Sequence, residues 1–344
     1  MRNKIFVLIS ILLFISFRAS PQTKSDDLSI LFYNVENLFD TRDDSLTNDN
    51  EFTPDGDRHW TYKRLNRKLL NLSKVILSSS EWNMPAIVAL CEIENRTVLE
   101  QLIHFSPLKS NSYKIIHKES PDHRGIDVAF LYDFSRFYPL NYRHLPLRNK
   151  NNSIIKTREI LYVSGILDQK DTLHFFINHW PSRYGGLLET KPERKLAATV
   201  LRQKVDELSV KFIAPKIVIL GDFNDQPNDE SLAKILNAQR ISSKPKESEL
   251  YNLSYDWLAG KGGTLKYQSQ WSVYDQIVVS GALLNSSSGF ITKPENAQII
   301  NHSFLLEKDE KYGGYKPLRT YFGFQYQGGF SDHLPILLKL ENID

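Results

Sequence analysis

Cysteine is almost absent from this chain of 344 residues, since Cys91 is the only one. A single cysteine excludes an internal disulfide, even in a compartment where one would form. Cys91 directly follows the apolar run AIVAL at residues 86–90. That position predicts a small buried hydrophobic side chain rather than a nucleophile.

An excess of either charge is also lacking. The chain has 43 Lys and Arg against 40 Asp and Glu, and three of the basic residues (Arg2, Lys4 and Arg18) lie in the first 22 positions. Without that segment the charges balance, so we expect no broad basic surface that grips nucleic acid. Recognition of phosphate must then be local. The remaining composition, 41% hydrophobic and 24% charged, is typical of a globular protein.

Long hydrophobic runs are lacking except at residues 5–17, which follow the basic start MRNK. This run is shorter than the roughly 20 residues that span a bilayer as a helix. It predicts a secretory signal peptide over residues 1–22, and hence a secreted or periplasmic protein. An uncleaved membrane anchor is the alternative. After removal of the signal we expect no stable membrane span and a monomeric protein.

Internal repeats and low-complexity linkers are lacking as well, and the rest of the chain alternates apolar strands with amphipathic helices. Helical spacing predicts helices over residues 62–77, 95–105 and 193–212. Apolar runs predict strands over residues 25–35, 85–92, 126–132, 159–167, 173–177, 216–222, 274–279 and 335–340. Continuous apolar strands separated by helices predict sheets that helices cover. Residues 40–57 are acidic and predict a long loop.

Polar residues with useful chemistry follow several of these strands. Glu92 follows one, Asn178 and His179 follow another, and the segment GDFN at residues 221–224 follows a third. Asp332 and His333 precede the last strand. Functional sites in layered α/β folds gather at strand ends, so we expect these side chains to meet at one rim.

The oxygen-bearing residues at this rim suit a hard cation. Glu92 and Asp332 supply carboxylates, Asn34 supplies an amide, and Glu36 is a further candidate because it lies two positions after Asn34. Such a set favours Mg²⁺ or Mn²⁺ over Zn²⁺. Each residue taken alone is more often a solvated loop residue.

Two histidines are placed for proton transfer, namely His179 in INHWPSR and His333 in SDHLP. Asp275, which precedes an apolar run, is a carboxylate that could hold one imidazole in the required tautomer. The pattern predicts metal-assisted attack of water on a phosphoester. No Gly-x-Ser-x-Gly motif occurs in the sequence, which disfavours covalent serine chemistry.

Seven segments in order resemble the motifs of the endonuclease/exonuclease/phosphatase superfamily, over residues 28 to 341. They are YNVENLFD, ALCEIEN, RGIDVAFLY, INHWPSR, ILGDFND, YDQIVVSG and GGFSDHLPI. The last two are similar to the deoxyribonuclease branch, and the first is similar to secreted bacterial members. The resemblance implies a four-layered α/β sandwich, with two mixed β-sheets face to face and helices outside. It also implies one catalytic domain over residues 25–344.

The resemblance also implies roles for individual residues. Asn34 and Glu92 match metal-site positions. Asp222 and Asn224 match a pair that binds metal or orients the phosphate and water. His179 matches the histidine on the leaving-group side.

The closing motif supplies the general base. Asp332 and His333 match a closing Ser-Asp-His, with His333 as general base and Asp275 as its orienting carboxylate. Asp127 is the candidate to orient His179, with a plain strand residue as the alternative.

Arginines and tryptophans flank these motifs and could contact substrate. Arg124, Arg183 and Arg194 could grip phosphate, and Trp180 and Trp271 could stack on a base or sugar. Surface arginines and packed tryptophans are equally common explanations.

The expected function is a Mg²⁺- or Mn²⁺-dependent phosphodiesterase, an endonuclease acting on nucleic acid. One alternative is a phosphoesterase for phospholipid head groups, nucleotides or sugar phosphates. The other is a non-catalytic binding module on the same fold.

Overall fold

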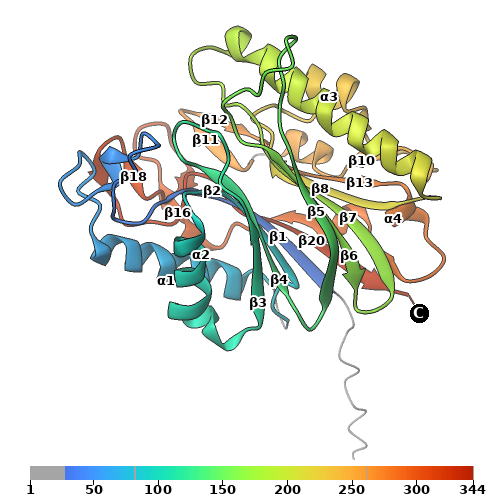
Figure 1. The fold of residues 1–344 in the computed structure, drawn as a ribbon, viewed down its shortest axis with the longest axis horizontal. Helices are drawn as coiled ribbons and strands as arrows, with labels where there is room; N and C mark the ends of the chain where they lie inside the picture. Colours follow the sequence, from blue (N-terminus) through green and yellow to red (C-terminus); the bar gives the residue numbers. More distant parts are fainter. Residues whose placement is uncertain (1–27, 81–82, 261, 344) are drawn as a thin grey trace, which may run out of the picture.

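Two seven-stranded sheets pack face to face in the computed structural model, which describes residues 28–80, 83–260 and 262–343 (Figure 1). Helices cover the outer faces, so the predicted four-layered α/β sandwich is confirmed. The predicted signal peptide lies outside the described residues.

The first sheet has the order β14-β20-β1-β2-β4-β3, with β15 also paired to β20. The first strand of the chain therefore lies beside the last in antiparallel register, with Ile30 opposite Leu338. The bounds are β1 Leu28–Leu38, β2 Ile87–Ile93, β3 Tyr113–His117, β4 Asp127–Asp133, β14 Phe290–Ile291, β15 Ala297–Ile299 and β20 Ile336–Asn342.

The second sheet has the order β5-β6-β7-β8-β13-β10-β9. Parallel β7 and β8 lie at its centre, and His179 at the end of β7 is opposite Asp222 at the end of β8. The bounds are β5 Phe137–Leu145, β6 Ile160–Leu167, β7 Asp171–His179, β8 Lys216–Asp222, β9 Ala238–Gln239, β10 Leu250–Asn252 and β13 Asp275–Ser280.

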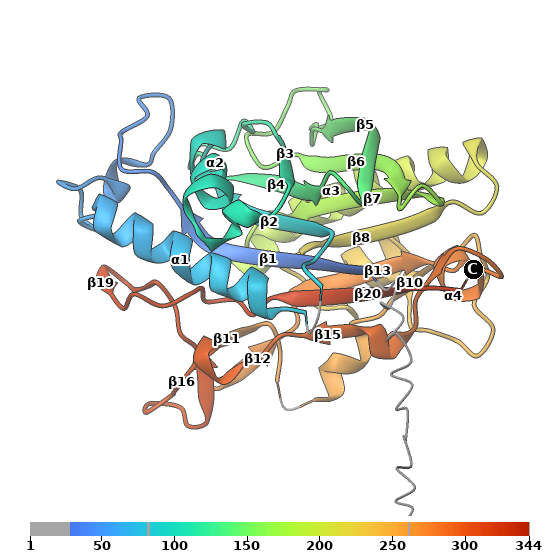
Figure 2. The ribbon, with the colours of Figure 1, turned by 90° about the horizontal axis from the view of Figure 1, so that it is seen from below.

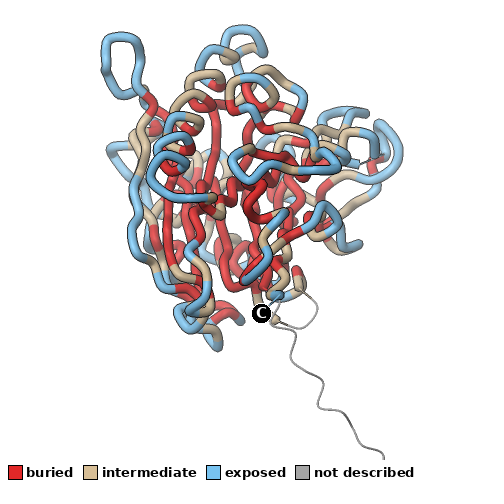
Figure 3. Tube along the Cα trace, turned by 90° about the vertical axis from the view of Figure 1, so that its right-hand side faces the viewer, coloured by how far each residue is buried: buried red, intermediate tan, exposed pale blue. Residues whose placement is uncertain are grey.

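Three apolar clusters hold the layers together. The central cluster joins the inner faces of both sheets, for example through Phe130 and Phe175. A second cluster packs helices α1 (Tyr62–Ser78) and α2 (Arg96–Phe105) on the first sheet. A third packs α3 (Leu187–Lys211) on the second sheet, while the short α4 (Ala282–Asn285) precedes β14. The strands form the buried interior seen in Figure 3.

Three small hairpins lie at the end of the molecule toward which β1 runs (Figures 1 and 2). Their strands are β11 Leu265–Tyr267, β12 Gln270–Ser272, β16 Leu306–Lys308, β17 Tyr315–Pro317, β18 Tyr321–Phe322 and β19 Gln325–Tyr326. Sequence patterns did not predict them, because strands of two or three residues are too short to show a period. The strands β3 and β5 were also not predicted.

The predicted helices and long strands occur close to their expected bounds. The main difference is α3, which begins at Leu187 rather than at residue 193 and contains Pro192 in its first turns. Pro192 is the sixth residue of α3, so it removes the backbone hydrogen bond that an N–H at this position would make to the carbonyl of Leu188. Among the described residues, no helix has the length and apolar character needed to cross a bilayer.

Candidate active site

Bulges at the ends of β1 and β2 direct the first polar side chains of the site. The pairing of β1 with β2 shifts register after Asn34, and the pairing of β2 with β4 shifts at Glu92. Glu36 and Glu92 have positive φ angles of 52° and 63°. A bulge bends the strand and re-aims its side chains. Asn34 Nδ2 can then donate to Glu92 Oε1 at 3.3 Å and to Asp222 Oδ2 at 3.1 Å.

The segment 221–224 brings the next polar groups against these strands. A Cβ at Gly221 would lie 2.4 Å from the backbone oxygen of Asn178, so only glycine allows β7 and β8 to approach this closely. Asp222 follows, and its Oδ1 accepts the backbone N–H of Asn224 at 2.9 Å. Asn224 has a φ of 50°, and its Nδ2 donates to the carbonyl oxygen of Trp180.

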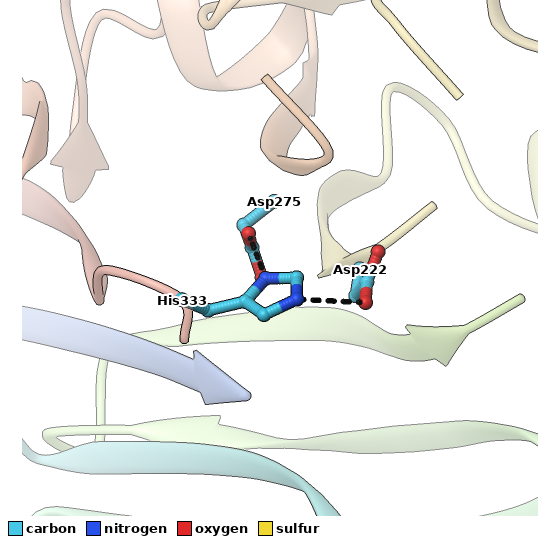
Figure 4. Close-up of side chains that lie close together, drawn as sticks. All are labelled: Asp222, Asp275 and His333. Carbon is cyan, nitrogen blue, oxygen red and sulfur yellow. Dashed lines mark hydrogen bonds and ion pairs between the residues drawn. The ribbon is translucent and has the colours of Figure 1, made fainter. Parts of the chain in front are cut away.

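His333 and Asp275 form a buried pair, as the sequence predicts (Figure 4). His333 Nδ1 lies 2.7 Å from Asp275 Oδ2, and His333 Nε2 lies 3.8 Å from Asp222 Oδ2. Burial opposes a charged imidazole, but the carboxylates of Asp275 and Asp222 outweigh it and raise the pKa of His333 well above its usual value. These three residues also form a group with metal-ligand spacing.

His179 also lies near Asp222. Its Nε2 is 3.8 Å from Glu92 Oε1 and 3.9 Å from Asp222 Oδ2. Burial, assisted by Arg158 and Arg124, lowers the pKa of His179 well below its usual value, so the ring is neutral. Its Nδ1 is buried and has no hydrogen-bond partner among the described residues.

The expected link between Asp127 and His179 does not occur. Asp127 Oδ2 lies 2.9 Å from Nε2 of His117, and its Oδ1 accepts the N–H of Ser120. The carboxylate of Asp127 bonds across the β3–β4 pair instead, because His117 at the end of β3 lies beside the start of β4. Asp127 therefore orients His117 and not His179.

Arg319 connects Glu36 to Asp332. Its guanidinium donates to Glu36 Oε1 at 3.1 Å and to Asp332 Oδ2 at 2.9 Å. Glu36 also accepts the backbone N–H groups of Thr320 and Tyr321. Both oxygens of Glu36 are thus occupied, and this carboxylate fits a positioning role better than the metal-ligand role expected from the sequence.

Negative charge exceeds positive charge in this region. Burial and the nearby Asp332 raise the pKa of Glu36, and burial with Asp275 and Glu92 raises that of Asp222. Lys68 is fully buried beneath them, where burial lowers its pKa to about 8 while Glu36 and Asp332 oppose that shift. A divalent cation would offset such an excess of carboxylates, so the donor set fits Mg²⁺ or Mn²⁺.

The expected substrate contacts lie elsewhere or carry other partners. Arg183 donates to the carbonyl of Asn224 and to Asp225 and Asp229, so it braces the loop after β8. Arg194 is fully buried and donates to Asp225. Of the three arginines, Arg124 is the most exposed, and it pairs with Asp122.

Trp180 does not face the site with its ring. It is 1% exposed, packs edge-on against Phe223, and donates through Nε1 to Asn178 Oδ1. The stacking role expected for Trp180 is therefore wrong, since no ligand reaches a side chain packed in this way. Trp271 is half-buried against the cluster under α1.

Sequence analysis did not predict three cationic residues of the candidate active site, namely Arg319, Lys68 and Arg158. Arg158 is buried and donates to Asp122 and to the carbonyl of Trp180. Lys68 lies in the predicted helix α1, whereas Arg158 and Arg319 lie outside the predicted elements. No motif marks any of the three, so only spatial proximity reveals them.

Comparisons with known proteins agree with this geometry. The family model described as Endonuclease/Exonuclease/phosphatase family matches residues 29–342. The chain matches none of the curated proteins.

Several solved structures share the fold at low sequence identity. Humanized D. rerio TDP2 is 14% identical with a TM-score of 0.56, covering 92% of this chain and 100% of that chain. The mannosyl-6-phosphatase of Bacteroides thetaiotaomicron is 16% identical with a TM-score of 0.56, covering 92% and 100%. The human nocturnin catalytic domain is 15% identical with a TM-score of 0.53, covering 92% and 94%.

The resemblance predicted from seven sequence motifs is thus confirmed over nearly the whole described chain. This chain belongs to the endonuclease/exonuclease/phosphatase family.

Proposed function

We propose that this protein is a Mg²⁺- or Mn²⁺-dependent phosphodiesterase that cleaves nucleic acid as an endonuclease. Family membership supports a hydrolase acting on phosphoester bonds. The observation that carries the proposal is the pair His333–Asp275, at 2.7 Å, with its free ring nitrogen directed toward Asp222. This is the geometry of an oriented general base beside a group that holds water or phosphate.

His333 takes a proton from the attacking water in this mechanism. In the neutral ring, Nδ1–H donates to Asp275, which fixes the tautomer and leaves the lone pair of Nε2 available. The nearby carboxylates raise the pKa of His333, and a cation that offsets their charge would oppose this shift and favour the neutral ring. Asp222 and Asn224 orient the water and the scissile phosphate. Asp275 stabilises the imidazolium that forms when the proton arrives.

His179 acts on the phosphate from the other side. Its neutral ring donates one N–H to a phosphoryl oxygen, on the leaving-group side implied by the family pattern. Its burial at 4% exposure keeps water away from that oxygen, which strengthens the hydrogen bond.

Glu92, Asp332 and the amide of Asn34 are the residues that would hold the cation. When bound, the cation would offset the charge that develops on the phosphate. Arg319 holds Asp332 in place through its hydrogen bond of 2.9 Å.

Residues 1–22 support a secreted or periplasmic location for this activity, since they combine a basic start with a short apolar run. Extracellular polynucleotide is a substrate that such a location would supply. A monomer suffices for the mechanism, because one chain provides every group named above.

A second candidate is a phosphoesterase for sugar phosphates, nucleotides or phospholipid head groups. The observation that favours it is the balance of charge in the chain without residues 1–22, since nucleic-acid enzymes more often carry a basic surface. One similar structure is described as a mannosyl-6-phosphatase.

The test compares hydrolysis of plasmid DNA, bis-p-nitrophenyl phosphate, mannose 6-phosphate and sphingomyelin, with Mg²⁺ and with EDTA. We expect nicking of plasmid DNA that EDTA and His333→Ala both abolish. His104→Ala, at an exposed position of α2, is the matched control and should keep full activity. Hydrolysis of a small phosphoester without nicking would favour the second candidate. Silence on the whole panel by folded protein would favour a binding module.

A further inference from the structure

A pocket of about 270 Å³ opens beside the candidate active site, and the mechanism above uses only Arg319 and Asp332 of its lining. Arg319 and Asp332 form one wall. The other walls come from the hairpin β11–β12, the hairpin β16–β17 and Phe322 of β18. These hairpins lie at the end of the molecule toward which β1 runs (Figure 2).

The hairpin β11–β12 is bonded to both members of the His333–Asp275 pair. Leu265 forms an isolated antiparallel bridge with His333. Thr264 accepts the N–H of Asp275 through its hydroxyl at 3.1 Å, and its carbonyl accepts the N–H of Leu334 at 2.7 Å. The next residues of this strand, Lys266 and Tyr267, line the pocket. The pocket is therefore fixed in position relative to the general base.

A buried ion pair fixes the second wall. Lys266 Nζ lies 2.8 Å from Asp309 Oδ2, and both side chains are 4% exposed. Lys266 also donates to the carbonyl of Gly313, and Asp309 accepts the N–H of Tyr312. A buried pair with these additional hydrogen bonds holds a turn in one geometry. It presets the turn that carries Lys311 and Tyr312.

Two lysines give the pocket a surplus of positive charge. Asp309 and Asp332, the acidic residues of the lining, are already paired with Lys266 and Arg319. Lys316 has Glu307 only at 3.5 Å, and no described carboxylate pairs with Lys311. An anionic group can therefore bind here without first displacing a strong ion pair.

Three exposed aromatic side chains surround these lysines, and the ammonium groups of Lys311 and Lys316 lie over the rings of Tyr312 and Phe322. Tyr267 is 71% exposed, Phe322 is 64% exposed and Tyr312 is 41% exposed. Large exposed aromatic side chains gathered around one pocket are typical of a binding site rather than of ordinary surface. Planar rings bind to such faces by stacking.

We propose that this pocket binds an unpaired nucleoside and its phosphate next to the scissile bond. Stacking on Tyr267, Phe322 and Tyr312 would hold the base, while Lys311 and Lys316 would hold the phosphate. The exposed aromatic side chains of the lining favour a planar base, which can stack on them. This inference rests on the proposed function, of which it specifies the substrate.

The substrate that follows is single-stranded. A base within a duplex is stacked and paired, so it must leave the helix before its faces can contact protein rings. The volume admits one ring system with its phosphate rather than a longer segment. Duplex DNA would then be cleaved only where it opens.

The test is equilibrium binding of fluorescein-labelled oligonucleotides to the full protein in EDTA. Only binding is measured, and hydrolysis is not part of the readout. The probes are a single strand, its duplex, and an abasic strand of the same length that keeps every phosphate. We expect the single strand to bind at least about tenfold more tightly than the abasic strand, since stacking of one base commonly accounts for such a factor. The duplex should bind less tightly than the single strand.

Variants separate the contribution of base stacking from the contribution of phosphate binding. Tyr267→Ala with Phe322→Ala should remove the difference between the single strand and the abasic strand. Lys311→Ala with Lys316→Ala should instead reduce the slope of log Kd against log salt by about 1 to 2. The matched controls are Tyr138→Ala, whose side chain is 59% exposed on β5, and Lys211→Ala at the end of α3, and both should bind like the unmodified protein.

Equal binding of the single strand and the abasic strand would overturn the inference, as would pocket variants that bind normally. Displacement of the probe by mannose 6-phosphate but not by a nucleoside monophosphate would overturn the assignment of a base. Binding in EDTA does not require catalysis. Failure of the nuclease proposal, with no hydrolysis of any nucleic acid, is thus distinguishable from failure of this one.

Discussion

Three residues of the site, Glu36, Glu92 and Asn224, have left-handed backbone conformations. Side chains with a Cβ occupy this region at a cost of roughly 1–3 kcal/mol each. The strand bulges and the hydrogen bonds to Asn37, Thr320 and Asp222 hold these conformations. The geometry of single residues, and not only their identity, therefore gives the site its shape.

Asp275→Asn should lower kcat on a phosphodiester by about 10²- to 10⁴-fold, because an amide no longer fixes the tautomer of His333 or stabilises its charge. Rates of plasmid or bis-p-nitrophenyl phosphate hydrolysis measure the effect. Asp256→Asn is the matched control, since its side chain is 68% exposed and pairs with Arg240 on the surface. Full activity of the Asp275→Asn variant would contradict the assignment of His333 as the general base.

Trp180→Phe should lower the free energy of unfolding by about 1–3 kcal/mol, because Asn178 Oδ1 loses its buried donor. The KM for nucleic acid should not change, since the ring packs in the core. Urea denaturation and steady-state kinetics measure the two quantities. Trp257→Phe, at a half-buried position, is the comparison. A raised KM at unchanged stability would restore the stacking role.

At the scale of elements, the contact between β7 and the end of α3 contains a histidine that is buried in neutral form. His174 Nδ1 lies 2.8 Å from the hydroxyl of Tyr162 on β6, and its ring lies against Phe212. Burial, assisted by Lys211, lowers the pKa of His174 to about 4. Lys204, over the ring of Tyr162, adds a further positive charge on this face.

Stability should therefore fall as the pH falls from 6.5 to 4. In that window the unfolded chain binds a proton at His174 that the folded chain does not, so the unfolded state gains up to roughly 3 kcal/mol. Above pH 6.5 both states are neutral and the effect is absent. His174→Gln should flatten the dependence of Tm on pH in this window, whereas His104→Gln should not. An unchanged dependence in His174→Gln would show that other groups control acid unfolding.

At the scale of the whole molecule, both sheets contribute carboxylates to one end of the sandwich. Glu92 comes from β2 of the first sheet, Asp222 comes from β8 of the second, and Asp332 precedes β20. Their mutual repulsion opposes folding unless a cation offsets it. A cation bound at this site would therefore couple its binding to the packing of the two sheets.

Mg²⁺ should therefore raise Tm, and EDTA should reverse the change. A cation at 100 times its Kd adds about 2.7 kcal/mol to the free energy of unfolding. Glu92→Gln should reduce the shift and raise Tm in EDTA, because it removes a repelling charge. Glu310→Gln, at a side chain 77% exposed, should behave like the unmodified protein. Equal melting with Mg²⁺ and EDTA would argue against a cation at this site.

The sequence by itself determined sheets that helices cover and most of the polar constellation, while the family resemblance implied the four layers. Long apolar strands and amphipathic helices have a regular period, and residues at strand ends must lie at a rim, so Glu92, His179, Asp222 and His333 could be brought together without coordinates. The pairing of His333 with Asp275 also followed from the family pattern.

Only the tertiary structure decided the partners of each polar group. Asp127 bonds His117, Trp180 packs on Phe223, and Arg319 binds Glu36, because each choice depends on which side chains are near after folding. The pocket of the short hairpins is likewise a tertiary feature, since its strands are too short for a period and its walls join segments far apart in the chain. The spacing of apolar residues along the chain predicts which side chains are buried. Hydrogen bonds and ion pairs depend on distances between side chains, and only the packed fold fixes these distances.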